Sequence, residues 1–239
     1  MKLNTTYRST EDEIMDDFSL KGEELRQALD KIAKINQLLG GNKVTLDGIK
    51  ELLKDVPKNQ QITIVDVGCG NGDMLRALAK FGKNSDLNLN LIGIDANQFT
   101  IDYAEKLSKE YKEISYRCED VFKADFENLK YDIVLCTLTL HHFTEDKILD
   151  LLSVFNKNAS IGIIINDLHR SKIAYRLFQL ICIVFQLNNM SKIDGLTSIL
   201  RGFKKEELHI YSKKMNFKAY SIHWKWAFRY QWIIRNKIN

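Results

Sequence analysis

Short runs of apolar and β-branched residues recur along the chain, separated by longer stretches in which apolar residues follow a helical spacing. The runs lie at residues 62–67, 89–94, 114–117, 131–136 and 160–165. Such runs, bounded by turn residues, are typical of strands buried in a sheet core. With 239 residues the chain is long enough to form one large α/β domain around them.

The residues before the first of these runs follow a helical pattern. Thr10 is followed by acidic residues, which predicts a capped helix start. Leucine and isoleucine then recur at helical spacing over residues 25–39, and two glycines end that helix. Thr45 is expected to cap a shorter helix that runs to Leu53. We therefore expect residues 1–60 to form a helical cover.

After the last of these strands, residues 171–190 are almost wholly apolar over the length of a helix. We expect one inserted helix here, a lid that is buried or meets an apolar ligand. The predicted elements that follow are a loop, a helix and an antiparallel strand pair: 194–203, 205–214, and 218–224 with 228–234. The sheet domain is therefore expected to span residues 61–239, with a lid insertion at about 168–200.

The most informative stretch joins the first predicted strand to the helix after it. Asp66 is followed by Gly68, Gly70 and Gly72, and a helical pattern starts at Met74. Glycines allow positive φ and a close backbone approach to a ligand, and a helix start favours polar or negative ligand groups. Dinucleotide loops have the spacing G-x-G-x-x-G and P-loops end in G-K-[ST], and this stretch has neither. A glycine turn that binds nothing is the structural alternative.

This stretch resembles the first motif of class I, seven-strand S-adenosylmethionine-dependent methyltransferases, in which an acid precedes G-x-G-x-G. The resemblance implies an α/β fold with a doubly wound, mostly parallel seven-stranded sheet, a C-terminal antiparallel hairpin, an N-terminal helical cover and an inserted lid helix. It also implies that S-adenosyl-L-methionine is the cofactor and that it is bound by Asp66, Gly68, Cys69, Gly70 and Gly72.

Two further acidic positions fit the same family. Asp95 ends the second predicted strand and precedes Ala96, as in the family's second motif, where an acid accepts hydrogen bonds from ribose hydroxyls. An N-cap of the next helix, at residues 99–111, is an alternative or additional role for Asp95. After the third predicted strand, the resemblance implies that Asp120 contacts the adenine amino group and that the backbone of Val121 contacts the ring.

The fourth predicted strand resembles the family's Y/F-D-x-V motif, and the loop after it faces the methyl donor in that family. Thr137 is therefore a further cofactor-contact candidate. His141 and His142 lie in this loop, where an imidazole that titrates near neutral pH would serve as a general base. We favour His142 as the base and keep His141 as the second candidate. One of the two is expected to pack or to hold the loop instead.

The fifth predicted strand leads to Asp167 and His169 at the same sheet edge. Ligands of such sheets bind outside the carboxyl ends of the strands, so both residues are candidates for substrate contact. The sequence shows no metal-ligand spacing, so we expect no metal.

The predicted acceptor is a small lipophilic molecule such as a phenolic, quinone-like or polyketide compound. The apolar lid and the aromatic hairpin offer apolar walls, and the chain resembles bacterial tailoring methyltransferases of such compounds. Nucleic acid is disfavoured, because the fourth strand is followed neither by N/D-P-P-Y/F nor by a Pro-Cys pair. An RNA methyltransferase and a non-catalytic S-adenosylmethionine-binding accessory protein remain the alternatives. The sequence leaves the oligomeric state open.

The net charge of +4 hides an asymmetry along the chain. Residues 168–239 contain fourteen Lys and Arg against three Asp and Glu, while the first 167 residues contain 21 against 28. All three tryptophans lie in the basic part. Basic and aromatic residues together suit weak peripheral contact with an anionic membrane, and a solvated basic face is the alternative.

The four cysteines are scattered and form no C-x-x-C pair, so neither a disulfide framework nor a zinc site is indicated. They suit a reducing, cytoplasmic compartment. The N-terminus shows no basic-then-apolar leader pattern. The longest apolar run, residues 177–187, is too short to span a bilayer.

Overall fold

A computed structural model describes residues 3–57 and 59–236 of the chain. Its strands are β1 (Gln61–Val67), β2 (Asn88–Asp95), β3 (Ile114–Cys118), β4 (Tyr131–Thr137), β5 (Ala159–Leu168), β6 (Tyr220–Lys225) and β7 (Arg229–Arg235). Its α-helices are α1 (Glu23–Leu38), α2 (Gly41–Leu52), α3 (Asp73–Ser85), α4 (Gln98–Leu107), α5 (Ala124–Asn128), α6 (Glu145–Asn158), α7 (Lys172–Val184), α8 (Asn189–Arg201) and α9 (Lys205–Lys214). Two short 3₁₀ turns are η1 (Ile14–Asp16) and η2 (Leu140–His142).

The strands form one seven-stranded sheet in the order β3-β2-β1-β4-β5-β7-β6. The first five strands run parallel, and β7 is antiparallel to both β5 and β6. β1 is central, and its residue Ile64 pairs with Leu91 of β2 and with Ile133 of β4. This topology confirms the predicted doubly wound sheet and its C-terminal hairpin.

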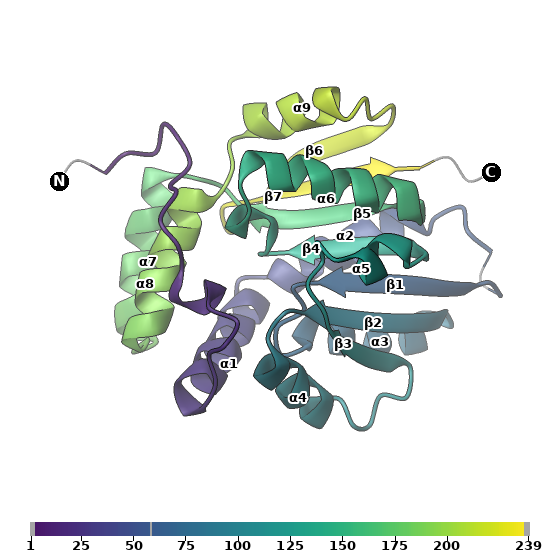
Figure 1. The fold of residues 1–239 in the computed structure, drawn as a ribbon, viewed down its shortest axis with the longest axis horizontal. Helices are drawn as coiled ribbons and strands as arrows, with labels where there is room; N and C mark the ends of the chain where they lie inside the picture. The colour runs from purple at the N-terminus through teal and green to yellow at the C-terminus, as the bar shows by residue number, and fades with distance from the viewer. Residues whose placement is uncertain (1–2, 58, 237–239) are drawn as a thin grey trace.

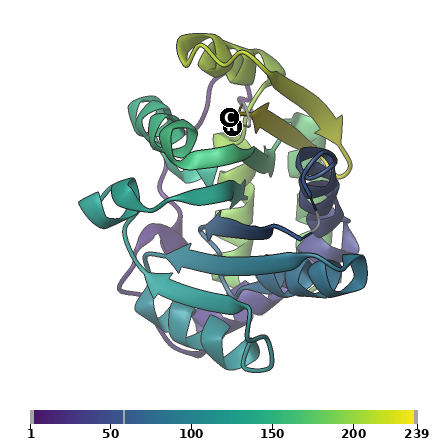
Figure 2. The ribbon, with the colours of Figure 1, turned by 90° about the vertical axis from the view of Figure 1, so that its right-hand side faces the viewer.

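Helices cover both faces of the sheet (Figure 2). One apolar core lies between the sheet and helices α5, α6 and α9, and the other lies between the sheet and helices α2, α3 and α4. Successive strand residues point to opposite faces, so the fully buried strands supply both cores and read as nearly continuous apolar runs. The sheet is therefore recognisable from the sequence.

The carboxyl ends of the parallel strands meet a third group of elements. In Figure 1, α1, α7, α8 and the N-terminal segment lie beyond the arrowheads of β1, β4 and β5. We call residues 3–20 the N-terminal strap. The strap is fixed across the sheet edge by long-range hydrogen bonds, for example from Ser9 N to Leu200 O (3.0 Å) and from Arg170 Nε to Thr5 O (3.1 Å). A ligand at the strand ends is thus enclosed by segments from both ends of the sequence.

The N-terminal predictions were wrong in two details. Residues 10–13 do not start a helix, because the strap backbone forms hydrogen bonds with α8 instead, for example from Ser9 N to Leu200 O and from Ile14 N to Asp194 Oδ1. The helix α1 begins only at Glu23, after Gly22. Thr45 does not cap a helix, because it lies inside α2 and is fully buried. Its hydroxyl accepts a hydrogen bond from Asn166 Nδ2 (3.0 Å). The role of this threonine is therefore a tertiary contact with β5 and not a helix cap.

The lid differs more from the prediction. In place of one helix and a loop, the structure has two helices, α7 and α8, and residues 194–201 belong to α8. Gly195 lies inside α8, where the ring of Phe178 occupies the space that a β-carbon would take. The glycine therefore allows α7 and α8 to come into close contact. α7 is also not buried all round: Ile173, Ile183 and Val184 are largely exposed. No helix in the described part of the chain is long and apolar enough to cross a membrane.

Candidate active site

The glycine loop lies at the end of β1 and is tied to β2. The backbone N–H groups of Gly68 and Cys69 both donate to Ile94 O, at 2.8 and 3.0 Å. Gly68 and Gly70 have φ of +70° and +52°, values that side chains rarely adopt. A β-carbon at Gly68 would collide with Thr139, whereas one at Gly70 would meet only Leu29, at 3.8 Å. The loop thus presents open backbone at Gly70 to the cavity that both Gly70 and Leu29 line.

Asp95 closes this loop from the end of β2. Its carboxylate accepts hydrogen bonds from Gly70 N (3.1 Å) and from Asn97 N (3.0 Å). Burial raises the pKa of Asp95, although these hydrogen bonds oppose the change. The helix α4 is capped by Asn97, which accepts from Thr100 N at 2.9 Å, so the predicted N-cap role of Asp95 was wrong by two residues. The Asp95 side chain is left to hold the loop and to line the cavity.

Three carboxyl groups lie close together at this end of the cavity. Burial, together with the charges of Asp73 and Asp95, raises the pKa of Asp66 well above its usual range. Asp66 is almost fully buried, and its Oδ1 has no hydrogen-bond partner among the described residues. Like charges in a buried site disfavour ionisation unless a cation joins them. This end of the cavity therefore suits a positively charged ligand group.

A buried, positively charged side chain lines the same cavity. Arg229, the first residue of β7, is 4% exposed, and its Nε and Nη1 have no hydrogen-bond partner in the described part of the chain. Burial lowers the pKa of Arg229 to about 10, against the opposing charges of Asp167 and Asp73. Unpaired donors of a buried guanidinium are energetically unfavourable, so the site suits an anionic ligand group. With the three acids, it favours a ligand that has both an ammonium or sulfonium and a carboxylate.

The loop after β4 lies above this cavity and contains both candidate histidines. His141 is 2% exposed; its Nδ1 lies 2.7 Å from Asp167 Oδ1, and its backbone N–H donates to Asp167 Oδ2 (3.1 Å). Burial alone would lower the pKa of His141, but the carboxylates of Asp167 and Glu13 outweigh it and raise the pKa to about 9. His142 is less buried, and its Nδ1 lies 2.6 Å from Asp16 Oδ1. Of the two imidazoles, His142 is the more accessible from the cavity.

Comparison with known proteins agrees with this geometry. Residues 58–230 match the family described as a methyltransferase domain. The chain belongs to this family. At the level of sequence, 89 residues of this chain are 33% identical to the ubiquinone biosynthesis O-methyltransferase of Coxiella burnetii (strain Dugway 5J108-111). The match covers 35% of this chain and 36% of that protein. Over 101 residues, this chain is also 33% identical to YxjB of Bacillus subtilis (strain 168), which is named as a 23S rRNA guanine methyltransferase. That match covers 41% of this chain and 34% of that protein.

Solved structures share the fold of this chain. The plantazolicin methyltransferase BpumL, solved in complex with S-adenosylhomocysteine (SAH), aligns with this chain with a TM-score of 0.67 and 16% identity. The alignment covers 88% of this chain and 90% of that one. The matched segment spans about a third of the length of the curated relatives. These likenesses establish family and fold, while activity and acceptor have to be argued from the site.

The structure brings most of the predicted site residues to one cavity. Those that line it are Asp66, Gly68, Cys69, Gly70, Asp95, Ala96, Asp120, Val121, Thr137, His141 and His142. Gly72 adjoins the loop and is the N-cap residue of α3, with a φ of +76°. Asp120 accepts a hydrogen bond from Phe122 N (3.1 Å), and Val121 is buried beside it.

The two candidates for substrate contact lie elsewhere. Asp167 is buried beneath His141 and holds its ring and backbone, so it contacts the histidine and not the open cavity. His169 lies at the β6–β7 end, where Trp224 Nε1 donates to its Nδ1 (3.2 Å) and the ring of Tyr230 lies 5.0 Å away. Burial, with the nearby positive charges, lowers the pKa of His169. The geometry thus points to Asp167 as a positioning residue for His141.

The residues that close the site were not predicted from the sequence. Asp194 of α8 accepts hydrogen bonds from Ile14 N (2.7 Å) and Met15 N (3.0 Å) of the strap. Arg201 donates to the carbonyls of His141 and His142 and to Asp16 Oδ2, and so joins the β4 loop to the strap. No local signal marks these residues, because their partners are far away in sequence.

Proposed function

We propose that the protein transfers a methyl group from S-adenosyl-L-methionine to a small lipophilic acceptor. The observation that supports this most is one continuous cavity of about 840 Å³ with two different ends. The glycine loop, the acids and Arg229 form the charged end, while α1, α7 and α8 supply the apolar residues of the other end, among them Leu29, Leu177 and Ile181. Small-molecule sites are typically apolar cavities of this size with few polar groups.

The residues of the charged end fit S-adenosylmethionine. Its sulfonium and ammonium suit the three acids, and its carboxylate suits the unpaired donors of Arg229. Asp95 would accept the ribose hydroxyls, and Asp120 with Val121 would hold the adenine. When bound, S-adenosylmethionine supplies a reactive methyl group, so the chief task of this chain is alignment, worth about 7–11 kcal/mol in favourable cases.

We propose that His142 accepts the proton of an acceptor hydroxyl. It lines the cavity on the β4 loop, and Asp16 holds its ring through Nδ1. His141 is the second candidate, but its burial and its two carboxylate neighbours favour a role in fixing the loop. We further propose that residues 1–60 act as the cover of a domain at 61–239, with residues 168–200 as the lid, and that the protein works in the cytoplasm, where its free cysteines stay reduced.

The acceptor class is tested by incubating a cell extract with the protein and methyl-labelled S-adenosylmethionine. Label in the lipid-soluble fraction is expected. Label in RNA would favour the alternative that the identity with YxjB supports, namely an RNA methyltransferase. Binding of S-adenosylhomocysteine without label in any fraction would favour a non-catalytic accessory protein.

Asp95→Asn should weaken S-adenosylhomocysteine binding by about 1.5–3 kcal/mol, which is about 10- to 150-fold, because hydrogen bonds to a charged group contribute this much. Isothermal calorimetry measures the change. Asp102→Asn, on the exposed side of α4, is the matched control and should bind as the wild type does. Equal affinity of the Asp95 variant and the control would contradict the ribose role.

We also propose weak contact of α7 with an anionic membrane. Ile183 is 73% exposed on α7 and does not belong to the cavity lining. The basic surface is smaller than the sequence suggested, because Arg170, Arg201 and Arg229 are buried.

Ile183→Glu should reduce co-sedimentation with anionic vesicles at least about tenfold, since burial of an isoleucine is worth about 1.5–3 kcal/mol. Wild-type binding should fall with added salt, because screening weakens the attraction of basic residues. Ile210→Glu, on the exposed face of α9, is the control and should bind like the wild type. Absence of wild-type binding at low salt would refute membrane contact.

A further inference from the structure

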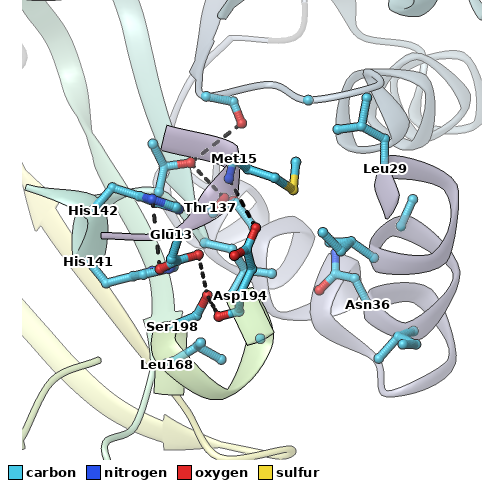
Figure 3. Close-up of a pocket in the computed structure, with 18 of the residues that line it drawn as sticks. Glu13, Met15, Leu29, Asn36, Thr137, His141, His142, Leu168, Asp194 and Ser198 are labelled. Carbon is cyan, nitrogen blue, oxygen red and sulfur yellow. Dashed lines mark hydrogen bonds and ion pairs between the residues drawn. The ribbon is translucent and has the colours of Figure 1, made fainter. Parts of the chain in front are cut away.

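Three potential metal ligands from distant parts of the chain converge on one wall of the cavity. Nε2 of His141 lies 3.5 Å from Oε1 of Glu13, and Nδ1 of His142 lies 3.8 Å from the same oxygen. All three donor atoms lie within 4.8 Å of one another. Figure 3 shows the carboxylate and the two imidazoles side by side, with Leu29 and Asn36 of α1 across the cavity.

Two of these atoms form only a long ion pair with each other, at 3.5 Å, and have no shorter hydrogen-bond partner among the described residues. They are Oε1 of Glu13 and Nε2 of His141, and both side chains are almost fully buried, 4% and 2% exposed. A buried polar atom without a partner is unfavourable unless a ligand satisfies it. Both atoms belong to residues that line the cavity, so a ligand in the cavity can reach them.

The surroundings orient these donors as the outer contacts of a metal site do. His141 presents Nε2 because Asp167 holds its Nδ1 at 2.7 Å, an arrangement that metal-bound histidines commonly share. Glu13 presents Oε1 because Ser198 Oγ donates to its other oxygen, Oε2, at 2.6 Å. Two backbone hydrogen bonds from Ile14 and Met15 to Asp194 fix the segment next to Glu13. The carboxylate and the first imidazole are thus preorganised.

We propose that Glu13, His141 and His142 bind a divalent transition-metal ion of the Zn²⁺ type. Two imidazoles and one carboxylate are the three protein ligands of a known kind of catalytic zinc site, which leaves a fourth position open. Ligand atoms about 2.0–2.2 Å from a shared tetrahedral ion lie about 3.3–3.6 Å apart. The two distances from Glu13 Oε1, 3.5 and 3.8 Å, are close to this range. Binding through Nδ1 of His142 replaces the contact of this atom with Asp16 Oδ1 (2.6 Å), so a proton on Nδ1 passes to Nε2 or to solvent. The ion also displaces the proton on Nε2 of His141 to solvent, while Asp16 keeps its ion pair with Arg201.

The open position would face the cavity. With the ion bound, His142 is a ligand and does not act as the base. If the proposed methyl transfer is correct, on which this one clause rests, an acceptor oxygen would occupy the open position and be held as its anion. The metal site itself does not depend on that reaction, and metal binding is measured without cofactor or acceptor.

The test is Zn²⁺ titration by calorimetry on untagged, chelator-treated protein, with Co²⁺ as a spectroscopic probe. We expect one Zn²⁺ per chain and a visible absorption spectrum of tetrahedral Co²⁺. Asp167→Asn should weaken Zn²⁺ binding about 10- to 100-fold, as loss of an outer-shell partner does. Glu13→Gln and His142→Gln remove ligands from two different elements and should weaken binding by more.

The matched control is Glu11→Gln, which changes an exposed acid of the same strap and should leave Zn²⁺ affinity unchanged. Binding of S-adenosylhomocysteine to each variant shows that the variant is folded, and it is a separate test of the proposed function. No Zn²⁺ binding by the wild type, or binding that neither Glu13→Gln nor His142→Gln weakens, would overturn the metal site. The second result would place the ion elsewhere, for example at the exposed thiol of Cys118.

Discussion

Gly70→Leu should abolish S-adenosylhomocysteine binding while the protein remains folded. A β-carbon at Gly70 meets only Leu29, at 3.8 Å, so the leucine side chain would fill the cavity beside the glycine loop and not the protein core. The backbone strain at φ +52° should lower stability by only about 1–2 kcal/mol. Calorimetry measures binding, and thermal unfolding measures the change in stability.

Gly22→Leu is the matched control for that strain. Gly22 also has a positive φ, +99°, and no atom lies within 4 Å of the position of its β-carbon. It precedes α1 and does not belong to the cavity lining. The control should be destabilised at least as much, because φ +99° with ψ −170° is open essentially to glycine alone, while its S-adenosylhomocysteine binding stays unchanged. Wild-type affinity in Gly70→Leu, or saturable binding of NAD by the unmodified protein, would show that the loop serves another ligand.

Arg229→Met should weaken S-adenosylhomocysteine binding about 10- to 150-fold, because a charge-assisted hydrogen bond contributes about 1.5–3 kcal/mol. In the absence of ligand, the variant should be at least as stable as the wild type. Nε and Nη1 of Arg229 have no hydrogen-bond partners to lose, and an unpaired buried charge is unfavourable. The two effects have opposite signs, which a general loss of structure could not produce. Calorimetry and thermal unfolding of the same preparation measure both.

5′-Methylthioadenosine supplies the ligand control. It has the adenosine and sulfur of S-adenosylhomocysteine but lacks the carboxylate that Arg229 is proposed to bind. Its affinity should be equal in the wild type and in Arg229→Met. Equal losses for both ligands would contradict the proposed contact and would place Arg229 near the nucleoside or in a purely structural role.

The two ends of the cavity are formed by different parts of the chain, so the fold does not by itself determine the acceptor. The sheet and glycine loop form the charged end, and they lie mostly within residues 58–230, which match the methyltransferase-domain family. The apolar end is formed by α1, α7 and α8, which lie outside the shared motifs. Under the proposed function, the cofactor end is common to many acceptors, whereas the helices decide which molecule enters. Changes in α7 should therefore alter acceptor choice more than cofactor affinity.

Local sequence determined the sheet and the glycine loop. Buried parallel strands need apolar side chains on both faces, so β1, β2, β4 and β5 are visible as apolar runs, whereas the edge strand β3 is short and largely exposed. The turn at Gly68 and Gly70 needs positive φ, which leaves glycine as the fitting residue. The hairpin β6–β7 and the helix α9 were also predicted, because alternation and helical spacing are short-range properties. These features depend on neighbours within a few residues.

The tertiary structure decided the closure of the site. Asp194 binds backbone groups of the strap that lie 180 positions earlier, and Arg170 binds Thr5 from 165 positions away. Contacts at such separations follow from how packed elements meet, and no local pattern records them. For the same reason the charge count assigned Arg170, Arg201 and Arg229 to a basic surface, although all three are buried. The sequence by itself determined the strands and the cofactor loop through local periodicity, and only long-range packing placed Glu13 beside the two histidines and Arg229 inside the cavity.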